Sequence, residues 1–123
     1  MDCRLELVIL PVTDVDRARD FYEHRVGFVV DHDQNVHEGL RFVQCTPRGS
    51  ACSIAFGVGL LDAGTPPVAG LQVVVDDARA AREELVGRGV DATEVEDLPW
   101  GSFTYFSDPD GNHWSVQQIP PRD

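Results

Sequence analysis

The sequence predicts an α+β fold built from two tandem modules, each with the order strand, helix and three strands (βαβββ). The first observation is that this order of patterns occurs twice along the 123 residues. The second is a nearly constant offset of 62 to 63 residues, which places Val12-Thr13-Asp14 over Val75-Asp76-Asp77 and Ser53 over Ser115. Internal similarity at one offset indicates a repeated structural unit. A four-stranded sheet with one helix keeps its other face open, so two such sheets side by side would form a curved, partly open cup.

The first module begins with a nearly continuous apolar strand over residues 5–12. Asp14 is a good N-cap for the helix that follows, and Gly27 is a natural residue to end it. Between these two residues the apolar side chains recur at helical spacing, at Val15, Ala18, Phe21, Tyr22 and Val26.

Three further strands complete the first module. The sequence predicts a short strand over 28–30, a polar turn over 31–35, and a hairpin of two strands over 40–45 and 51–56. The hairpin turns at Pro47, because proline fixes the backbone angle that the second position of a tight turn requires.

The second module repeats this order. A strand over 71–75 leads to a helix capped by Asp76 or Asp77 and ended by Gly87 and Gly89. The apolar stripe of this helix is expected at Ala78, Ala81, Leu85 and Val86.

The last part of the chain is expected to be β-structure. The pattern predicts a strand over 90–95 and a final hairpin that joins 103–106 to 113–119. An acidic turn separates them, at Glu94, Glu96 and Asp97. The final hairpin turns through the sequence Asp108-Pro109-Asp110-Gly111-Asn112.

The length favours a single domain over residues 1–123, with module one at about 4–57, a Gly- and Pro-rich linker at about 58–69, and module two at about 70–120. No apolar run is long enough to span a membrane, and the first strand is not followed by a cleavage pattern. We therefore predict a cytoplasmic protein.

The net charge limits the classes of binding partner, and the cysteine content indicates the state of the thiols. The net charge of −11 argues against nucleic acid and anionic membranes as partners. It is compatible with cationic ligands, although a charge of this size also serves solubility alone. Cys3, Cys45 and Cys52 are an odd number without a CxxC motif, which favours free thiols.

The chain resembles the vicinal oxygen chelate superfamily, which includes glyoxalases, extradiol dioxygenases, fosfomycin-resistance enzymes and bleomycin-resistance proteins. The resemblance covers essentially the whole chain. The motifs that carry it are Pro11-Val12-Thr13-Asp14, Phe21-Tyr22 and Gly27-Phe28 in the first half, and Val75-Asp76-Asp77 with Phe106-Ser107-Asp108-Pro109-Asp110-Gly111-Asn112 in the second. The resemblance implies paired βαβββ modules, a homodimer, and a cavity between facing modules that the partner chain often completes.

The same resemblance implies a divalent metal in that cavity, held by His or Gln of each first strand and Glu of each last strand. Carried over onto this sequence, the four ligand positions are Leu7, Ser53, Gly70 and Ser115, and none of them offers a carboxylate or an imidazole. A register slip of one residue would give Glu6 or Leu71 instead, and a slip of two would give Gln72. Glu6 would point to the opposite face, because side chains alternate along a strand. We therefore predict no metal and no cofactor.

Apart from the metal positions, the histidines are the side chains that could act as an acid or base, and most of them are expected at the surface. His24 is expected on the solvent side of the first helix, and His32 and His37 in a surface loop. His113 is the histidine considered as an acid or base, because it shares strand parity with Ser115 and could face the cup.

Strand alternation assigns the ligand-binding face. If Ser115 faces the cup, so do His113 and Gln117, while Phe103 and Tyr105 face it from the preceding strand. By the repeat, Arg41 and Val43 would be their counterparts in the first module, unless a bulge breaks the alternation across that hairpin. The complete set of expected ligand-binding residues is Trp100, Phe103, Tyr105, His113, Ser115, Gln117, Ser53 and Leu7.

The aromatic members of this set form a wall that could stack a flat or cationic ligand. The alternative is that Trp100, Phe103 and Tyr105 are core or dimer-interface residues. The favoured function is a metal-free small-molecule-binding protein of the bleomycin-resistance type, sequestering an aromatic or cationic natural product or antibiotic. The alternative function is a metal-dependent lyase, isomerase or dioxygenase of the glyoxalase type with displaced ligands.

Overall fold

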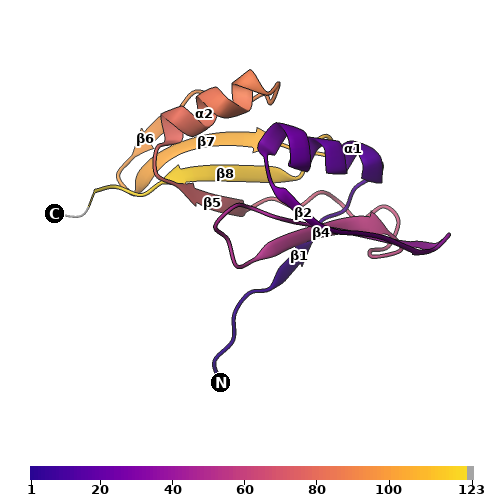
Figure 1. Ribbon diagram of the computed structural model, residues 1–123. Helices are drawn as coiled ribbons and strands as arrows, with labels where there is room; N and C mark the ends of the chain where they lie inside the picture. Colours follow the sequence, from indigo (N-terminus) through magenta and orange to yellow (C-terminus); the bar gives the residue numbers. More distant parts are fainter. Residues whose placement is uncertain (122–123) are drawn as a thin grey trace. The chain divides into compact units, whose positions relative to one another are not determined.

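The computed structural model describes residues 1–121 and consists of two compact units, Met1–Pro67 and Val68–Asp123 (Figure 1). Each unit holds one four-stranded mixed sheet with helical structure on one face. This confirms the predicted α+β class and the tandem βαβββ modules. The predicted module bounds, the linker at 58–69 and the homodimer stay predictions.

The sheet of the first unit has the strand order β1-β4-β3-β2. Its strands are β1 (Leu7–Ile9), β2 (Val29–His37), β3 (Leu40–Thr46) and β4 (Ser53–Val58). β1 pairs with β4 in parallel, and the remaining neighbours are antiparallel.

The helix of the first unit begins and ends where the sequence predicts. Helix α1 (Val15–Asp20) continues into a π-helical segment, η1 (Phe21–Val26). The Asp14 carboxylate accepts a hydrogen bond from the Arg17 backbone N–H at 3.0 Å and so caps the helix. Gly27 ends it with a φ of 90°, which a glycine adopts without strain.

Aromatic packing joins this helix to its sheet. The Tyr22 side chain is fully buried, and its ring centroid lies 5.7 Å from that of Phe28 and 5.6 Å from that of Phe56. Burying rings of this size supplies much of the apolar burial of the unit.

The predicted polar turn over 31–35 is wrong, because β2 continues through it to His37. β2 is an edge strand with one side open to solvent, so it tolerates polar side chains that would be costly in a central strand. His32 and His37 are exposed as expected, but they lie on this strand rather than in a loop.

The sheet of the second unit has the equivalent strand order β5-β8-β7-β6. Its strands are β5 (Leu71–Val75), β6 (Glu96–Leu98), β7 (Gly101–Ser107) and β8 (His113–Gln118). Helix α2 (Ala78–Gly87) is capped by Asp77, whose carboxylate accepts the Arg79 and Ala80 backbone N–H groups at 3.0 and 3.1 Å.

Two predictions for the second unit are wrong. Val86 is not part of the buried stripe, because it lies one residue beyond Leu85 around the helix and is 47% exposed. Residues 90–95 do not form a regular strand. They are held beside β7 by backbone contacts such as Thr93 N–H to Tyr105 O at 3.0 Å, and β6 begins only at Glu96.

The turn between β7 and β8 is held by its own side chains. The Asn112 N–H and side-chain amide donate to the two Asp108 carboxylate oxygens at 2.9 and 2.8 Å, and the Asn112 Oδ1 accepts the Val68 N–H at 2.9 Å. Asn112 is fully buried. The motif therefore fixes both the hairpin and the chain segment that enters β5.

Candidate functional site

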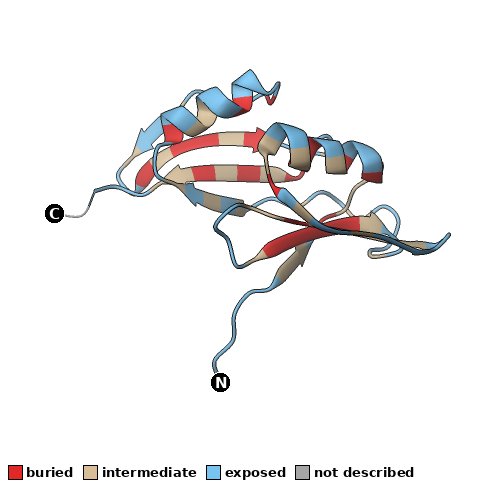
Figure 2. Cartoon of the chain, in the orientation of Figure 1, coloured by how far each residue is buried: buried red, intermediate tan, exposed pale blue. Residues whose placement is uncertain are grey.

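Each side of the second sheet has its own set of residues. Trp114 and Phe106 stack on each other at 6.0 Å on the side covered by α2, while Phe103, Tyr105, His113, Ser115 and Gln117 alternate with them and lie on the other side. Figure 2 shows this alternation of burial along β7 and β8. The predicted facing of Phe103 and Tyr105 relative to Ser115 is confirmed, and we call this side the open face of the second unit.

Three rings form a row on this open face. The rings of Phe103 and Tyr105 are 6.0 Å apart and within 3° of parallel, and those of Tyr105 and His113 are 5.9 Å apart and within 13°. Phe103 is buried, whereas Tyr105 and His113 are half-buried. The His113 Nδ1 lies 3.2 Å from the Ser107 hydroxyl, which holds the ring in place.

An amide chain holds the turn that carries Trp100. The Gln72 side chain donates to Gln117 Oε1 at 2.7 Å, and Gln117 Nε2 donates to the Trp100 carbonyl at 3.0 Å. The Trp100 side chain is 60% exposed. Gln117 thus bonds the Trp100 backbone directly, and its other end is held by Gln72, which was not among the expected ligand-binding residues.

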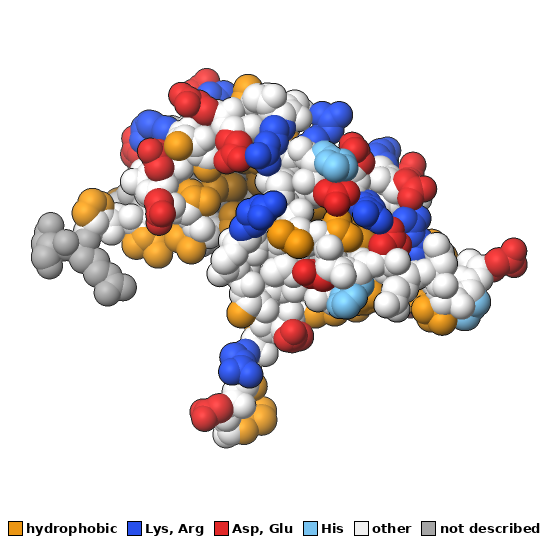
Figure 3. Space-filling model, viewed as in Figure 1, with side chains coloured by type: hydrophobic (Ala, Val, Ile, Leu, Met, Phe, Trp, Pro, Cys, Tyr) orange, Lys and Arg blue, Asp and Glu red, His pale blue; other side chains and the backbone are white. Residues whose placement is uncertain are grey.

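Hydrophobic side chains are also exposed on this unit. Val74, which shares the open face with Gln117, is 61% exposed. Figure 3 shows hydrophobic side chains gathered on the side of this unit away from α2, whereas charged side chains dominate the side with the helix. An apolar surface with aromatic rings and a few amides has the composition of a small-molecule site.

The corresponding face of the first unit carries a hydrogen-bonded set of polar side chains beside the apolar Leu7 and Phe42. The Ser53 hydroxyl lies 2.6 Å from that of Thr46, the Thr46 hydroxyl donates to the Asp31 carboxylate, and the Gln44 side chain donates to Ser53 at 3.4 Å. Asp31 can reach Thr46 because the pairing of β2 with β3 shifts by one residue between Val30 and His32.

The hydrogen bonds of this polar set all run in one direction, from donor to acceptor. Because the Thr46 proton goes to the Asp31 carboxylate, the Ser53 proton must go to Thr46, and Ser53 in turn accepts from Gln44. Ser53 is buried and already hydrogen-bonded within its own unit. The sequence identified Ser53 but missed Thr46, Gln44 and Asp31, because only the strand register brings these side chains together.

Arg41 and Val43 are not the counterparts of the aromatic row. Val43 is fully buried and Arg41 forms an ion pair with Asp16 of α1 at 2.8 Å, so both lie on the helix side. In the second unit Tyr105 pairs with Ser115, so an offset of 62 residues for both strands would pair Val43 with Ser53. Val43 instead pairs with Phe56, three residues further along β4. A shift in pairing by an odd number of residues moves the side chains of the shifted strand to the opposite face of the sheet.

The positions of the family's metal ligands do not form a ligand set. Leu7 lies opposite Ser53, and Gln72 rather than Gly70 lies opposite Ser115. One aliphatic side chain, one amide and two hydroxyls include none of the carboxylate or imidazole donors that hold a divalent metal. Within residues 1–121, no three His, Cys, Asp or Glu side chains group in a way that could hold a metal ion.

The strongest electrostatic shifts lie away from these open faces. Asp33 on β2 accepts hydrogen bonds from Arg41 at 2.9 and 3.0 Å and from Arg19 at 2.5 Å. These bonds, the one from Arg41 first, hold the pKa of Asp33 below its ordinary value. This cluster ties α1 to the sheet on the helix side.

The three cysteines are free, and they differ in environment. Burial raises the pKa of the Cys45 thiol to about 12, so this thiol is inert at neutral pH. Cys3 is exposed. His24 is exposed as predicted, and its Nε2 lies 3.2 Å from Glu23.

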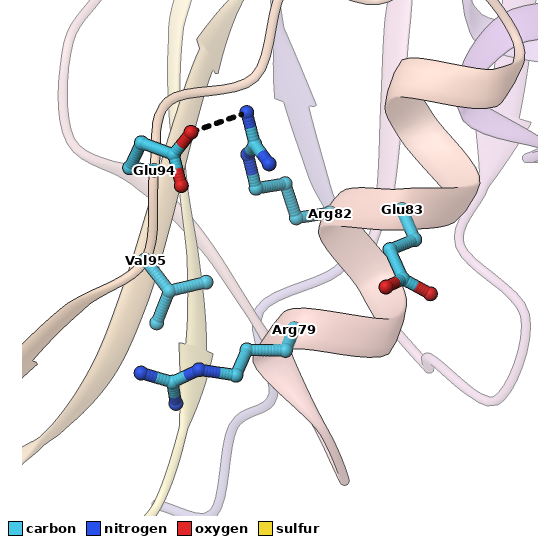
Figure 4. A pocket seen from close by; sticks show the side chains of 5 residues that line it. All are labelled: Arg79, Arg82, Glu83, Glu94 and Val95. Carbon is cyan, nitrogen blue, oxygen red and sulfur yellow. Dashed lines mark ion pairs between the residues drawn. The ribbon is translucent and has the colours of Figure 1, made fainter.

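A hollow of about 240 Å³ lies between α2 and the segment before β6, lined by Arg79, Arg82, Glu83, Glu94 and Val95 (Figure 4). Arg82 pairs with Glu94 at 3.2 Å and Arg79 with Asp97 at 2.8 Å. Its arginines are thus already paired with carboxylates of the same unit. We favour the open face over this hollow as the candidate site.

Comparison with known proteins adds a family and several solved relatives. A model of the Glyoxalase/Bleomycin resistance protein/Dioxygenase superfamily matches residues 4–116. The chain is 33% identical to TnmS3, an antibiotic binding protein from Streptomyces sp. CB03234, with a TM-score of 0.86 over 97% of this chain and 98% of that one.

Two further structures are similar over nearly the same length. One is a glyoxalase/bleomycin resistance protein from Streptomyces sp. CB03234, at 34% identity and a TM-score of 0.80 over 94% of this chain and 100% of that one. The other is a superfamily member from Sphaerobacter thermophilus DSM 20745, at 30% identity and a TM-score of 0.82 over 94% and 97% of the two chains. The similarity therefore extends across both units.

Proposed function

The chain belongs to the Glyoxalase/Bleomycin resistance protein/Dioxygenase superfamily, and we propose that it is a metal-free small-molecule-binding protein that sequesters an aromatic natural product or antibiotic. The observation that carries the proposal is the row of near-parallel rings of Phe103, Tyr105 and His113 on the open face of the second unit. A row of rings contributes binding energy through stacking and area burial, and sequestration requires nothing beyond affinity.

The polar groups around the row support the same function. The amide of Gln117 is held at both ends, by Gln72 and by the Trp100 carbonyl, so it is fixed before a ligand arrives. Ser115 lies on the open face between Gln72 and Tyr105, and its hydroxyl can donate or accept a hydrogen bond. Fixed polar groups on an apolar surface orient a ligand at little cost in conformational entropy.

One of the named relatives supports this choice. TnmS3 is an antibiotic binding protein, and this chain resembles it over nearly its full length. Of the positions Leu7, Ser53, Gln72 and Ser115, only Gln72 offers a side chain of the kind that the family uses as a ligand, and neither serine position supplies the expected Glu. Both facts favour binding over catalysis.

Calorimetric titration and tryptophan fluorescence test the proposal. The probes are bleomycin, an enediyne and an anthraquinone, each titrated into the full chain. The exposed Trp100 should change its emission on binding, while Trp114, which is 2% exposed, reports on the fold. Binding of a flat probe with a micromolar or lower dissociation constant supports the proposal. The proposal is overturned if no probe reaches a dissociation constant of about 100 micromolar, which is a binding free energy on the order of −5 kcal/mol.

Metal analysis separates this function from metal-dependent catalysis. The purified protein is measured by elemental analysis before and after loading with nickel, manganese and iron. One equivalent of metal that resists dialysis and is removed by a chelator would contradict the metal-free proposal. We expect none to be retained, since hydroxyls and one amide bind such ions weakly.

A further inference from the structure

The open face of the second unit carries a carboxylate that the ligand-binding set above does not include. Glu96 on β6 pairs with Phe103 on β7, and paired residues of antiparallel strands point to the same side of the sheet. The next residue, Asp97, confirms the alternation, because it accepts the Ser102 hydroxyl at 2.6 Å and pairs with Arg79 of α2. Asp97 therefore lies on the helix side, and Glu96 lies beside the aromatic row.

Within residues 1–121, this carboxylate has no hydrogen-bond or ion-pair partner. The sequence contains no lysine. The three described arginines of the second unit are paired elsewhere, Arg79 with Asp97, Arg82 with Glu94 and Arg88 with Glu84. All three arise from α2 or the residue that ends it, on the covered side of the sheet.

The position of Glu96 and its negative charge indicate which chemical groups a ligand on this face would carry. Directly opposed side chains on neighbouring strands have Cβ atoms about 5 Å apart, so the carboxylate of Glu96 lies beside the buried Phe103 ring and within reach of a molecule that contacts the half-buried Tyr105 ring. A carboxylate accepts charge-assisted hydrogen bonds from a protonated amine. The rings favour a flat aromatic system and also attract cations.

We propose that Glu96 selects ligands that join a planar aromatic system to a protonated amine, such as an amino sugar or aminoalkyl group. This rests on the proposed function and defines the class of molecule that the open face prefers. The net charge of −11 favours the approach of such a cation and disfavours anionic aromatics. Glu96 supplies the local contact that a general negative charge does not.

Two matched probes test the assignment. One is an anthraquinone with an aminoalkyl side chain, and the other is the same anthraquinone with a hydroxyalkyl side chain of equal length. The wild-type chain should bind the amine about tenfold more tightly. In Glu96→Gln this preference should fall to less than threefold, while the affinity for the neutral probe stays the same.

Glu94→Gln is the matched control, because Glu94 is also exposed and acidic but pairs with Arg82 on the covered side. It removes the same unit of charge, so a general electrostatic effect would lower the amine preference equally in both variants. Retention of the preference in Glu94→Gln supports a local contact at Glu96. Equal loss in both variants overturns it.

The possible outcomes separate this inference from the function on which it rests. If both probes bind and the wild type does not distinguish them, or if Glu96→Gln keeps the preference, the role of Glu96 is refuted while the binding function stands. If neither probe nor the panel above binds, the proposed function itself is refuted. Thermal unfolding at unchanged midpoint shows that Glu96→Gln is folded, as expected for an exposed side chain.

Discussion

The two units share one topology but present different chemistry on their open faces. In the first unit, hydroxyl, amide and carboxylate groups of Gln44, Ser53, Thr46 and Asp31 form a hydrogen-bonded chain. In the second unit, the rings of Phe103, Tyr105 and His113 occupy the equivalent strands. The two units therefore share the same strand order, but the side chains on their open faces differ.

The two hairpin turns differ in the same way, and the largest effect on stability is expected there. Asn112→Ala removes the side-chain hydrogen bonds that join Asn112 to the Val68 N–H and to the Asp108 carboxylate in a buried turn. It should lower the free energy of unfolding by about 3 kcal/mol. In the first hairpin, Ser50→Ala removes two exposed hydrogen bonds, from the Ser50 hydroxyl to the Cys52 carbonyl and from the Cys52 N–H to the Ser50 hydroxyl. Because both are exposed to water, the loss should cost about 0.5 kcal/mol.

Urea unfolding followed by circular dichroism measures both turn variants. Equal losses would show that the second turn has no special structural role. The comparison is informative because both turns join the last two strands of their own unit.

The two open faces should differ in ligand binding. Tyr105→Ala removes the central ring of the row and should weaken binding of the aminoalkyl anthraquinone about 30-fold, equivalent to about 2 kcal/mol. Thr46→Val, in the first unit, keeps the size of the side chain and should change the affinity less than threefold. Calorimetric titration measures both, and a greater loss in Thr46→Val would place the binding surface on the open face of the first unit.

The ion pairs that join each helix to its sheet differ in burial. Asp33 is largely shielded and binds Arg41 and Arg19, so Asp33→Asn should lower the unfolding free energy by about 1.5 kcal/mol at pH 7. Asp97 and Arg79 are both exposed, and Asp97→Asn should leave stability nearly unchanged. Chemical unfolding of the two variants tests this contrast.

The pH dependence of the Asp33 effect follows from its lowered pKa. The carboxylate contributes its full stabilisation above the pKa of the unfolded chain, about 3.9, and loses it as the pH falls through the lower pKa of the folded state. The stability difference between wild type and Asp33→Asn should therefore shrink below pH 4. A constant difference down to pH 2 would contradict the assignment.

The two serines at equivalent positions give the smallest contrast. Ser53 is buried and hydrogen-bonded to Thr46 and Gln44, so Ser53→Ala should cost about 1 kcal/mol. Ser115 is half-buried and forms no side-chain hydrogen bond within residues 1–121, so Ser115→Ala should change stability by less than about 0.5 kcal/mol. Thermal or urea unfolding distinguishes the two values, and equal costs would show that the polar chain in the first unit is not stabilising.

Much of the fold could be predicted because its signals are local. Asp14 and Asp77 cap helices in the structure as the sequence suggests, because an N-cap depends only on the next few residues. The turn from Asp108 to Asn112 likewise closes its own hydrogen bonds. The edge strand β2 was only partly predicted, since its polar composition is acceptable only at the edge of a sheet.

The candidate site was predicted unevenly for a related reason. The facing of Phe103, Tyr105 and Gln117 followed from alternation within two strands joined by a short turn. Gln72 was named only as the result of a register slip, and Glu96 was not expected on this face at all. The places of both depend on pairing between strands that are distant in sequence or poorly regular. Pairing of this kind leaves no pattern within either strand.

Within residues 1–121, no helix is long and apolar enough to cross a membrane, and the predicted cytoplasmic location stays a prediction. The sequence by itself determined the duplicated βαβββ order, the helix ends and the β7–β8 turn. Only the tertiary structure decided the registers. In the first hairpin the pairing differs by three residues from the one that the repeat predicts, and Arg41 and Val43 therefore lie on the helix side. In β5 the pairing differs by two residues, so the same face is presented, with Gln72 in the place expected for Gly70. Side chains alternate with a period of two along a strand, so register decides which residues a ligand meets.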